Sequence, residues 1–392
     1  MTTEENPDRH GPMIEFYRRH RISPVRQDIR DLGAHFQRRA ALYRHLGILP
    51  AFLAGRSVLE VGPGSGHNAL FTASLAPARY LLVEPNPTAV EHLRELFAGY
   101  PELPAAVEIA PVLLADFATA ERFDFVFCEG MLVGMSRPAE HLRLLAGLAK
   151  PGGVVVATCS DAISIFPETL RRLLAQLAID PDMPLERQLE TLEPIFAPHA
   201  GTLSGMTRSA ADWIVDNLIN PALANALFSI PEAVAALEGE CVFYGSSPRF
   251  VTDWRWHKSL HGEARAQNRE ALSQYWQSVH NLMDYRRTFP PRPEADNRRL
   301  AALCAQGWRQ MSDFEIDRDR GRLESIRETL AGVAAQAGDF SREIAAAVEE
   351  CRGFLGMPRP DWQALARSRD LGPLFGRGQQ YVSFSRSGGL GD

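Results

Sequence analysis

Short apolar runs alternate with amphipathic segments between residues 55 and 160. The run at 123–128 is almost wholly apolar, and a run of this length bounded by polar residues predicts a buried strand. Val90, Leu93 and Phe97 recur every three or four positions, as on the buried face of a helix. Strands that alternate with helices form a parallel, doubly wound sheet, whose ligand crevice lies beyond the carboxyl ends of the strands. The pattern therefore predicts an α/β fold.

A helical pattern precedes this region. Apolar residues recur every three or four positions until Gly47 and Pro50, where we expect the helix to end. We expect it to begin directly after Ser23 and Pro24, since proline is favoured at the first position of a helix. The apolar positions are Val25, Ile29, Leu32, Phe36, Tyr43 and Leu46.

Beyond residue 160 the pattern is mostly helical. An apolar run at 240–244 predicts a sixth strand, and a second run at 379–385 predicts a seventh. Proline runs at 290–293 and 358–360 break the helices between them. The expected parts are a helical cap over 1–54, a core over 55–256 with inserted helices at 161–239, a helical acceptor or cap region over 257–375, and the last strand with a tail over 376–392.

Closely spaced glycines join the first predicted strand to a helix, at Gly62, Gly64 and Gly66. Glycines allow tight dihedral angles and a close approach of the backbone to a ligand. A dinucleotide site needs the spacing G-x-G-x-x-G, whereas position 67 here is histidine. Glu60 would also repel a pyrophosphate but would suit a ligand that carries an ammonium group. These features disfavour a nicotinamide-dependent oxidoreductase and favour S-adenosylmethionine.

The segment V-L-E-V-G-P-G-S-G resembles motif I of the class I S-adenosylmethionine-dependent methyltransferases. Further segments resemble the family in the same order along the chain, at 80–84, 112–117, 123–130 and 148–156. The resemblance covers residues 55 to 160, and beyond them only 379–384 is similar to the last strand of the family. It implies a doubly wound Rossmann-like sheet, here with an N-terminal helical lid and a large helical insertion or C-terminal helical region.

The resemblance also implies roles for individual residues. Glu84 would accept the ribose hydroxyl protons of S-adenosylmethionine, and Asp116 would meet the adenine amino group with Phe117 against the ring. Glu129 follows the fourth strand, where related enzymes place a residue that faces the methyl group. The cofactor-binding residues implied in this way are Glu60, Gly62, Gly64, Gly66, Glu84, Asp116, Phe117 and Glu129.

The composition of the chain limits the kinds of partner that we expect it to bind. The net charge of −6 argues against a nucleic-acid or anionic-membrane partner, although it does not exclude a local basic patch. No apolar run approaches the roughly 20 residues that span a bilayer, and the acidic start is unlike a signal peptide, so we expect a cytoplasmic protein. No pair among the five cysteines has metal-ligand spacing, so we expect neither a metal nor a disulfide framework.

Catalytic residues are expected at or just after the carboxyl ends of strands. Glu129 could orient an amine or act as a base, and Asp161 and His257 are the further catalytic candidates. His257 belongs to a run of aromatic and cationic residues at 253–258. That run could hold an anionic or sugar-like acceptor through Trp254, or its tryptophans could simply anchor the inserted helices. Ser160 and Tyr244 occupy similar positions, and Tyr244 is a candidate contact for the acceptor.

Residues 16–28 are basic and aromatic, and two interpretations apply. The segment could be a nucleic-acid-binding arm, or a lid that folds against the catalytic domain and excludes water from it. The acidic chain as a whole favours the lid, with Tyr17 and His20 as contacts for the acceptor.

The sequence therefore predicts a methyltransferase that acts from S-adenosylmethionine on a small-molecule or glycan-like acceptor, at oxygen rather than nitrogen. The motif that amino-methylating nucleic-acid enzymes carry after the fourth strand is replaced by 129–132, which argues against base methylation. The alternatives are an N-methyltransferase of a small amine or amino acid and a non-catalytic S-adenosylmethionine-binding scaffold. A second copy of the chain is also retained as a candidate partner.

Overall fold

A computed structural model describes residues 11–22, 27–103, 105–221 and 227–388, with side chains from residue 15 onward. The chain divides into two compact units. The first comprises Met1–Cys159, Asn225–Gln274 and Gln380–Asp392, and the second comprises Ser160–Ala224 and Tyr275–Gln379. The helical region expected at 257–375 is therefore shared between the two units.

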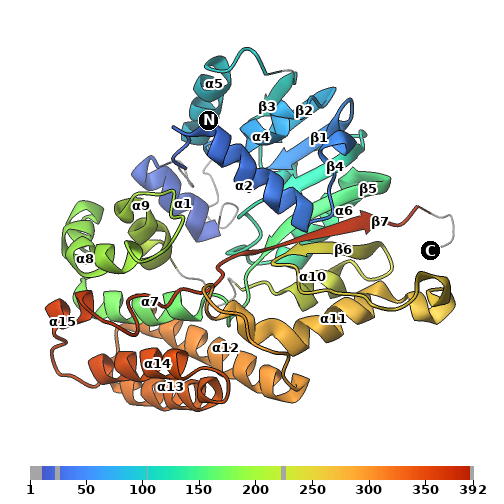
Figure 1. Ribbon diagram of the computed structural model, residues 1–392. Helices are drawn as coiled ribbons and strands as arrows, with labels where there is room; N and C mark the ends of the chain where they lie inside the picture. Colours follow the sequence, from blue (N-terminus) through green and yellow to red (C-terminus); the bar gives the residue numbers. More distant parts are fainter. Residues whose placement is uncertain (1–10, 23–26, 104, 222–226, 389–392) are drawn as a thin grey trace. The chain divides into compact units, whose positions relative to one another are not determined.

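The first unit is built on a seven-stranded sheet with the order β3-β2-β1-β4-β5-β7-β6 (Figure 1). Strands β1 to β5 are parallel, and β7 runs antiparallel to β5 and β6. This confirms the predicted doubly wound Rossmann-like sheet, including its sixth and seventh strands. The strands are β1 (Ser57–Val61), β2 (Arg79–Val83), β3 (Val107–Ala110), β4 (Phe123–Cys128), β5 (Ala149–Cys159), β6 (Cys241–Ser247) and β7 (Gln380–Arg386).

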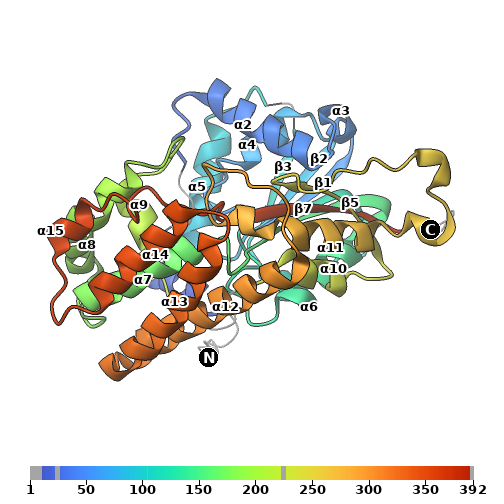
Figure 2. The ribbon, with the colours of Figure 1, turned by 60° about the horizontal axis from the view of Figure 1, so that its bottom comes forward.

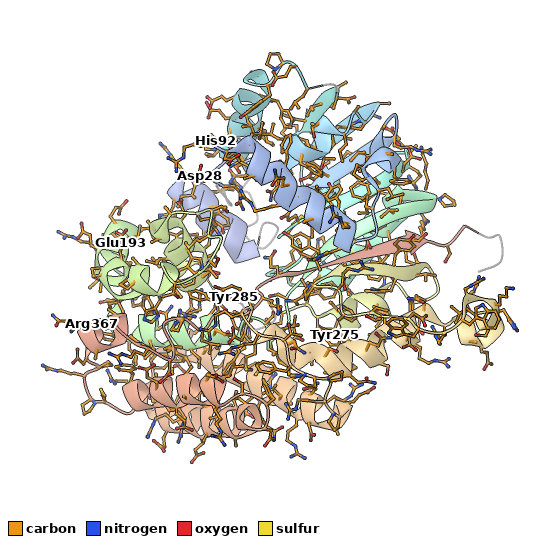
Figure 3. The ribbon with its side chains drawn as sticks, in the orientation of Figure 1. Asp28, His92, Glu193, Tyr275, Tyr285 and Arg367 are labelled. Carbon is orange, nitrogen blue, oxygen red and sulfur yellow. The ribbon has the colours of Figure 1, made fainter. Side chains whose placement is uncertain are left out.

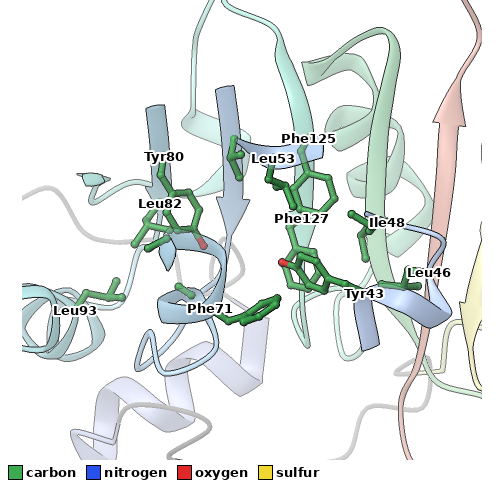
Figure 4. Close-up of a cluster of buried hydrophobic side chains, with 14 residues drawn as sticks. Tyr43, Leu46, Ile48, Leu53, Phe71, Tyr80, Leu82, Leu93, Phe125 and Phe127 are labelled. Atoms are coloured by element: carbon green, nitrogen blue, oxygen red, sulfur yellow. The ribbon is translucent and has the colours of Figure 1, made fainter. Parts of the chain in front are cut away.

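Buried aromatic residues hold the centre of this sheet against the N-terminal helix α2 (Leu32–His45). Tyr43 on α2 lies edge-on to Phe71, with ring centroids 5.1 Å apart, and its hydroxyl is 2.7 Å from Thr72 Oγ1. Phe125 and Phe127 of β4 complete the cluster (Figure 4). Helix α2 is thus part of the core of the first unit.

The start of this N-terminal helix differs from the prediction. Residues 23–26 lie outside the described residues, and 27–30 are not helical. Helix α2 begins at Leu32 because the Asp31 carboxylate accepts a hydrogen bond from Ala34 N at 2.8 Å, which caps the first turn. The remaining helices of the first unit are α1 (Gly11–His20), α3 (Pro50–Leu53), α4 (Ala69–Ser74), α5 (Pro87–Ala98), α6 (Pro138–Leu148) and α10 (Ile230–Ala236), and α11 (Gln267–Ser278) continues into the second unit.

The second unit is helical (Figure 2). Arg171 on α7 is fully buried, and its Nη2 donates to the carbonyl oxygens of Leu371, Gly372 and Leu374 at 2.8, 2.9 and 2.7 Å. Its guanidinium also lies 3.9 Å from the ring centroid of Phe375. The main helices are α7 (Phe166–Ala178), α8 (Leu185–Ala200), α9 (Ala210–Ile214), α12 (Glu294–Asp317), α13 (Leu323–Gly338), α14 (Arg342–Leu355) and α15 (Trp362–Ala366).

No helix in the described part of the chain is both long and apolar enough to cross a membrane.

Candidate cofactor and transfer site

The glycine loop leaves β1 at the carboxyl edge of the sheet. Gly62 N donates to Val83 O at 2.9 Å, which ties the loop to the end of β2. Gly66 has a φ of +80°, and a Cβ atom there would lie 2.4 Å from Leu93 Cδ2 on α5. Both the backbone angle and the close packing therefore require glycine at position 66.

Glu84 connects this loop to the second strand. Its side chain is 5% exposed, and its Oε2 accepts a hydrogen bond from Gly64 N at 3.0 Å while its Oε1 accepts one from Asn86 N at 2.9 Å. Burial raises the pKa of this carboxyl above its usual value. Glu84 thus fixes the shape of the glycine loop, and its role toward ribose stays a prediction.

Glu60 lies inside the sheet rather than at its open edge. It is 2% exposed, and its carboxylate accepts a hydrogen bond from the hydroxyl of Tyr80 on β2. Burial raises the pKa of Glu60 to about 7. This carboxyl can therefore be protonated near neutral pH, which weakens it as a partner for an ammonium group.

Glu129 stands at the centre of a buried polar network. Its Oε1 accepts hydrogen bonds from Arg39 Nη1 at 3.1 Å, from Asn68 Nδ2 at 3.0 Å and from the Tyr381 hydroxyl. Arg39 Nη2 also lies 2.9 Å from Glu129 Oε2, and only 7% of the arginine side chain is exposed. The network joins α2, the glycine loop, the end of β4 and β7 within the first unit.

Three buried atoms in this network make no hydrogen bond among the described residues, namely Nε and Nη2 of Arg39 and Oε2 of Glu129. The last two form the ion pair with each other, so only Arg39 Nε has no polar partner in the network. Sequence reasoning missed Arg39, Asn68 and Tyr381. Arg39 did carry a signal, because it occupies a position that the helical spacing of Phe36 and Tyr43 reserves for an apolar side chain.

The predicted adenine contacts lie on the surface after β3. Asp116 ends the short helix η2 (Leu114–Asp116) and is exposed, while Phe117 is half-buried. Beside the glycine loop, a shallow pocket is lined by Ser65, His67, His92, Glu95 and Leu96, and His92 is labelled in Figure 3.

Asp161 belongs to the second unit and is already engaged there. It is 5% exposed, and its carboxylate accepts hydrogen bonds from the hydroxyl of Tyr275 at 2.5 Å and from Ile163 N at 2.7 Å. Tyr275 is labelled in Figure 3. These bonds satisfy a buried acid, so its catalytic role stays a prediction.

The other predicted acceptor contacts fall into an exposed and a buried group. Trp254 is 92% exposed and Tyr244 is 64% exposed, and His257 is exposed in the short helix η4 (His257–Ser259). Trp254 therefore does not anchor the inserted helices by burial, which removes that interpretation. Tyr17 is buried and His20 is half-buried, with the His20 ring centroid 4.7 Å from that of Phe16.

Comparison with known proteins assigns the class. A family model described as a methyltransferase domain matches residues 59–155. The tRNA U34 carboxymethyltransferase of Chromohalobacter salexigens is 34% identical over 126 residues, which cover 29% of this chain and 36% of that protein. The enzyme of the same name from Methylococcus capsulatus is 35% identical over 117 residues, covering 29% and 35%. The chain thus spans about a third of the length of these relatives.

Solved structures resemble the chain only weakly. The N-methyltransferase NodS from Bradyrhizobium japonicum, in complex with S-adenosyl-L-homocysteine, has a TM-score of 0.31 and 17% identity, covering 38% of this chain and 74% of that one.

The glycine-loop motif, the order of the strands in the sheet and the family model agree with one another. Together they identify a class I, Rossmann-like methyltransferase domain in this chain. Its cofactor is S-adenosylmethionine, as the resemblance to motif I implied.

The relatives overturn the expected acceptor. A small-molecule or glycan-like acceptor and the absence of a nucleic-acid partner were both wrong expectations, because the matching relatives are named for tRNA. The net charge of −6 is a sum over the whole chain and does not report the charge of one surface. The missing motif after β4 concerns amino groups of bases, and its absence does not exclude other positions on a nucleic acid.

Proposed function

We propose that this protein transfers a methyl group from S-adenosylmethionine to tRNA. The observation that carries the proposal is the glycine loop tied to Glu84, which lies within the residues matched by the methyltransferase family model. The similarity to relatives named for tRNA supports tRNA as the acceptor. S-adenosylmethionine supplies an electrophilic methyl group on a sulfonium. The chain would act in the cytoplasm, where tRNA is available to it.

The residues at the carboxyl edge of the sheet suit the charged end of the cofactor. The amino-acid end of S-adenosylmethionine carries a carboxylate and an ammonium group. Arg39 Nε can donate to the carboxylate, because it makes no hydrogen bond among the described residues. Glu129 Oε2 makes an ion pair with Arg39 Nη2 but accepts no hydrogen bond there, so it can accept one from the ammonium. Glu129 is a better ammonium partner than Glu60, because Glu60 is buried inside the sheet and burial raises its pKa to about 7, so that it is partly neutral near neutral pH.

Glu129 acts in this proposal as a positioning residue rather than as a base. Its Oε1 already accepts three hydrogen bonds, and its Oε2 lies 2.9 Å from Arg39 Nη2. These donors hold the carboxylate in one orientation. Methyl transfer is an in-line displacement that depends mainly on alignment and on exclusion of water, which a rigid network can supply.

Cofactor binding is tested first, by calorimetry with S-adenosylmethionine and with S-adenosylhomocysteine. Glu84→Gln should weaken binding of both about tenfold, because a charged acceptor of ribose hydroxyls becomes neutral. Glu108→Gln on β3, an exposed carboxylate paired with Arg79, is the matched control and should bind like the unchanged protein. Equal affinities of all three proteins would reject the ribose role of Glu84.

Transfer is tested with radiolabelled S-adenosylmethionine on bulk tRNA, followed by mass spectrometry of the nucleosides. A labelled nucleoside that has gained one methyl group is expected, because S-adenosylmethionine supplies only a methyl group, and its mass confirms this. Glu129→Gln should weaken cofactor affinity, because the charge that faces the ammonium is lost, and should also lower kcat because alignment is disturbed. Tyr381→Phe should have both effects to a smaller degree, since Tyr381 contributes one bond to the network. Cofactor binding without any transfer to tRNA would contradict the proposed acceptor.

A further inference from the structure

Two tryptophans are presented to solvent by a loop of the first unit. We call residues 249–265 the tryptophan loop; it follows β6 and contains η4 and η5 (Gly262–Arg265). Trp254 is 92% exposed and Trp256 is 67% exposed. In Figure 2 this gold segment projects away from β6. Indole rings are large and apolar, and such exposure of two of them in one segment marks a binding surface.

The loop is ordered by its polar groups and not by its tryptophans. Thr252 N donates to Gln274 Oε1 at 2.6 Å, and Gln274 Nε2 donates back to Thr252 O at 3.1 Å. Arg255 Nε donates to Asp253 Oδ1 at 2.9 Å, and its Nη1 donates to Ala264 O at 2.9 Å. The polar side chains therefore bind the loop together while the indoles face outward.

The charge of the loop is opposite to that of the chain. Its four cationic residues outnumber its two carboxylates, Asp253 and Glu263, within a chain whose net charge is −6. Arg255 neutralises Asp253, with 2.7 Å between Nη2 and Oδ2. Lys258 Nζ lies 5.5 Å from the ring centroid of Trp256, so a cation and an aromatic face are presented together. The cationic residues are Arg249, Arg255, Lys258 and Arg265.

We propose that the tryptophan loop binds a single-stranded stretch of RNA, with bases stacked on Trp254 and Trp256 and phosphates held by Lys258 and its basic neighbours. The inference rests on the proposed function and adds the place where the RNA acceptor docks. Aromatic side chains stack on unpaired bases, whereas the bases of a duplex are already stacked on one another. The surplus of positive charge favours a polyanion over a second copy of this acidic chain.

The test measures binding of a fluorescent single-stranded oligouridine by anisotropy, with an RNA duplex of matched length as comparison. Trp254→Ala and Trp256→Ala should each weaken single-strand binding about five- to hundredfold, and Trp254→Phe should recover part of the loss because a ring remains. Lys258→Gln should reduce the salt dependence of binding by about 0.7 in the slope of log K against log salt. Ile316→Ala on α12, which removes a 79% exposed apolar side chain, is the control and should change nothing.

The outcomes separate this inference from the proposed function. If tRNA is methylated but the Trp254→Ala, Trp256→Ala double variant binds oligouridine unchanged, the docking inference fails and the proposed function stands. If oligouridine binding depends on the tryptophans but no tRNA is modified, the docking inference stands and the proposed acceptor fails. Two results would overturn the inference, provided that the double variant still binds oligouridine unchanged. If sedimentation shows that the double variant no longer self-associates, the surface binds a second copy of the chain. If the double variant no longer binds phosphatidylglycerol vesicles, the surface binds a membrane.

Discussion

Two buried carboxyls of the first unit and two buried histidines of the second unit have pKa values that are shifted in opposite directions. In the first, burial raises the pKa of Glu60 to about 7, and Glu84 shifts in the same direction. In the second, burial lowers the pKa of His199 and of His280 to about 4. The cause is the same in both, since burial disfavours whichever form is charged. Each unit also buries groups of the other kind, such as His35 in the first and Glu168 in the second, so the contrast concerns Glu60 and Glu84 against His199 and His280.

The difference shows that the stability of the folded state can depend on pH in opposite directions in two units of one protein. A carboxyl with a raised pKa stabilises the folded state most at low pH, and that contribution is lost as the pH rises through the folded value. A histidine with a lowered pKa does the reverse, and its contribution is lost as the pH falls. Hydrogen exchange followed by mass spectrometry measures each unit separately, because its peptides can be assigned to β1 or to α7.

The largest expected effect is on the second unit. Arg171→Met should destabilise it by about 3 to 5 kcal/mol, because the carbonyl groups of Leu371, Gly372 and Leu374 lose their buried donor. Faster exchange in α7 peptides is the measurement. Arg187→Met on α8, whose side chain is 70% exposed, should cost at most about 0.5 kcal/mol and so change exchange only slightly. Equal effects of the two substitutions would show that the buried arginine does not hold this unit together.

Glu60→Gln should have the next largest effect, confined to the first unit. The pKa of Glu60 rises from 4.5 to about 7 on folding, so its ionisation costs stability progressively between pH 4.5 and 7. The variant cannot ionise and keeps an acceptor for Tyr80, so it should be more stable than the unchanged protein at pH 8 by up to about 3 kcal/mol, with no gain at pH 4. A gain that is equal at both pH values would exclude ionisation as its cause.

Acidification should affect the second unit by a somewhat smaller amount. The pKa of His199 falls from 6.5 to about 4 on folding, beside Arg171, so stability is lost as the pH drops from 6.5 to 4. About 2 kcal/mol is expected from this residue, after allowance for its incomplete burial. His199→Gln should weaken the pH dependence of exchange in α8 peptides. If exchange in β1 peptides accelerated equally on acidification, the contrast between the units would be lost.

The smallest effects should come from the surface and should be alike in both units. The pairs Arg137–Glu140 and Arg187–Glu190 are both exposed and three residues apart along the chain. Removal of either charge should cost about 0.2 to 0.5 kcal/mol in the helix that carries it, and less at high salt. Thermal unfolding in low and high salt measures this. A large loss in only one unit would extend the contrast beyond buried groups.

Most of the sheet was predictable from sequence because strands such as β2 and β4 are local apolar runs, and the glycine loop fixes where the first strand ends. Strand β3 was not predicted, since its four residues include Glu108. The beginning of α2 was not, since Pro24 and Asp31 are both plausible starts and only the bond from Ala34 N to Asp31 decides between them. The local pattern of apolar residues thus predicts that a helix exists, whereas its first residue depends on which of two possible capping residues is used.

The site was predictable only in part. Glu129 could be found from its position after β4, but its partner Arg39 lies 90 residues away and meets it only in the folded chain. Trp254 carried an ambiguous signal, because an indole is as suited to a core as to a binding surface, and its 92% exposure decides the matter. The acceptor was mispredicted because a net charge averages over surfaces of opposite sign.

Strand β7 has a consequence for how the protein is made. It lies between β5 and β6, with Val154 opposite Ser385 and Cys159 opposite Gln380. A ribosome adds about 5 to 20 residues each second, so β5 waits on the order of ten seconds or more for its partner after it has been synthesised. During that interval its edge offers unpaired N–H and C=O groups to any other chain. The nascent protein should therefore depend on chaperones that shield this edge until β7 emerges.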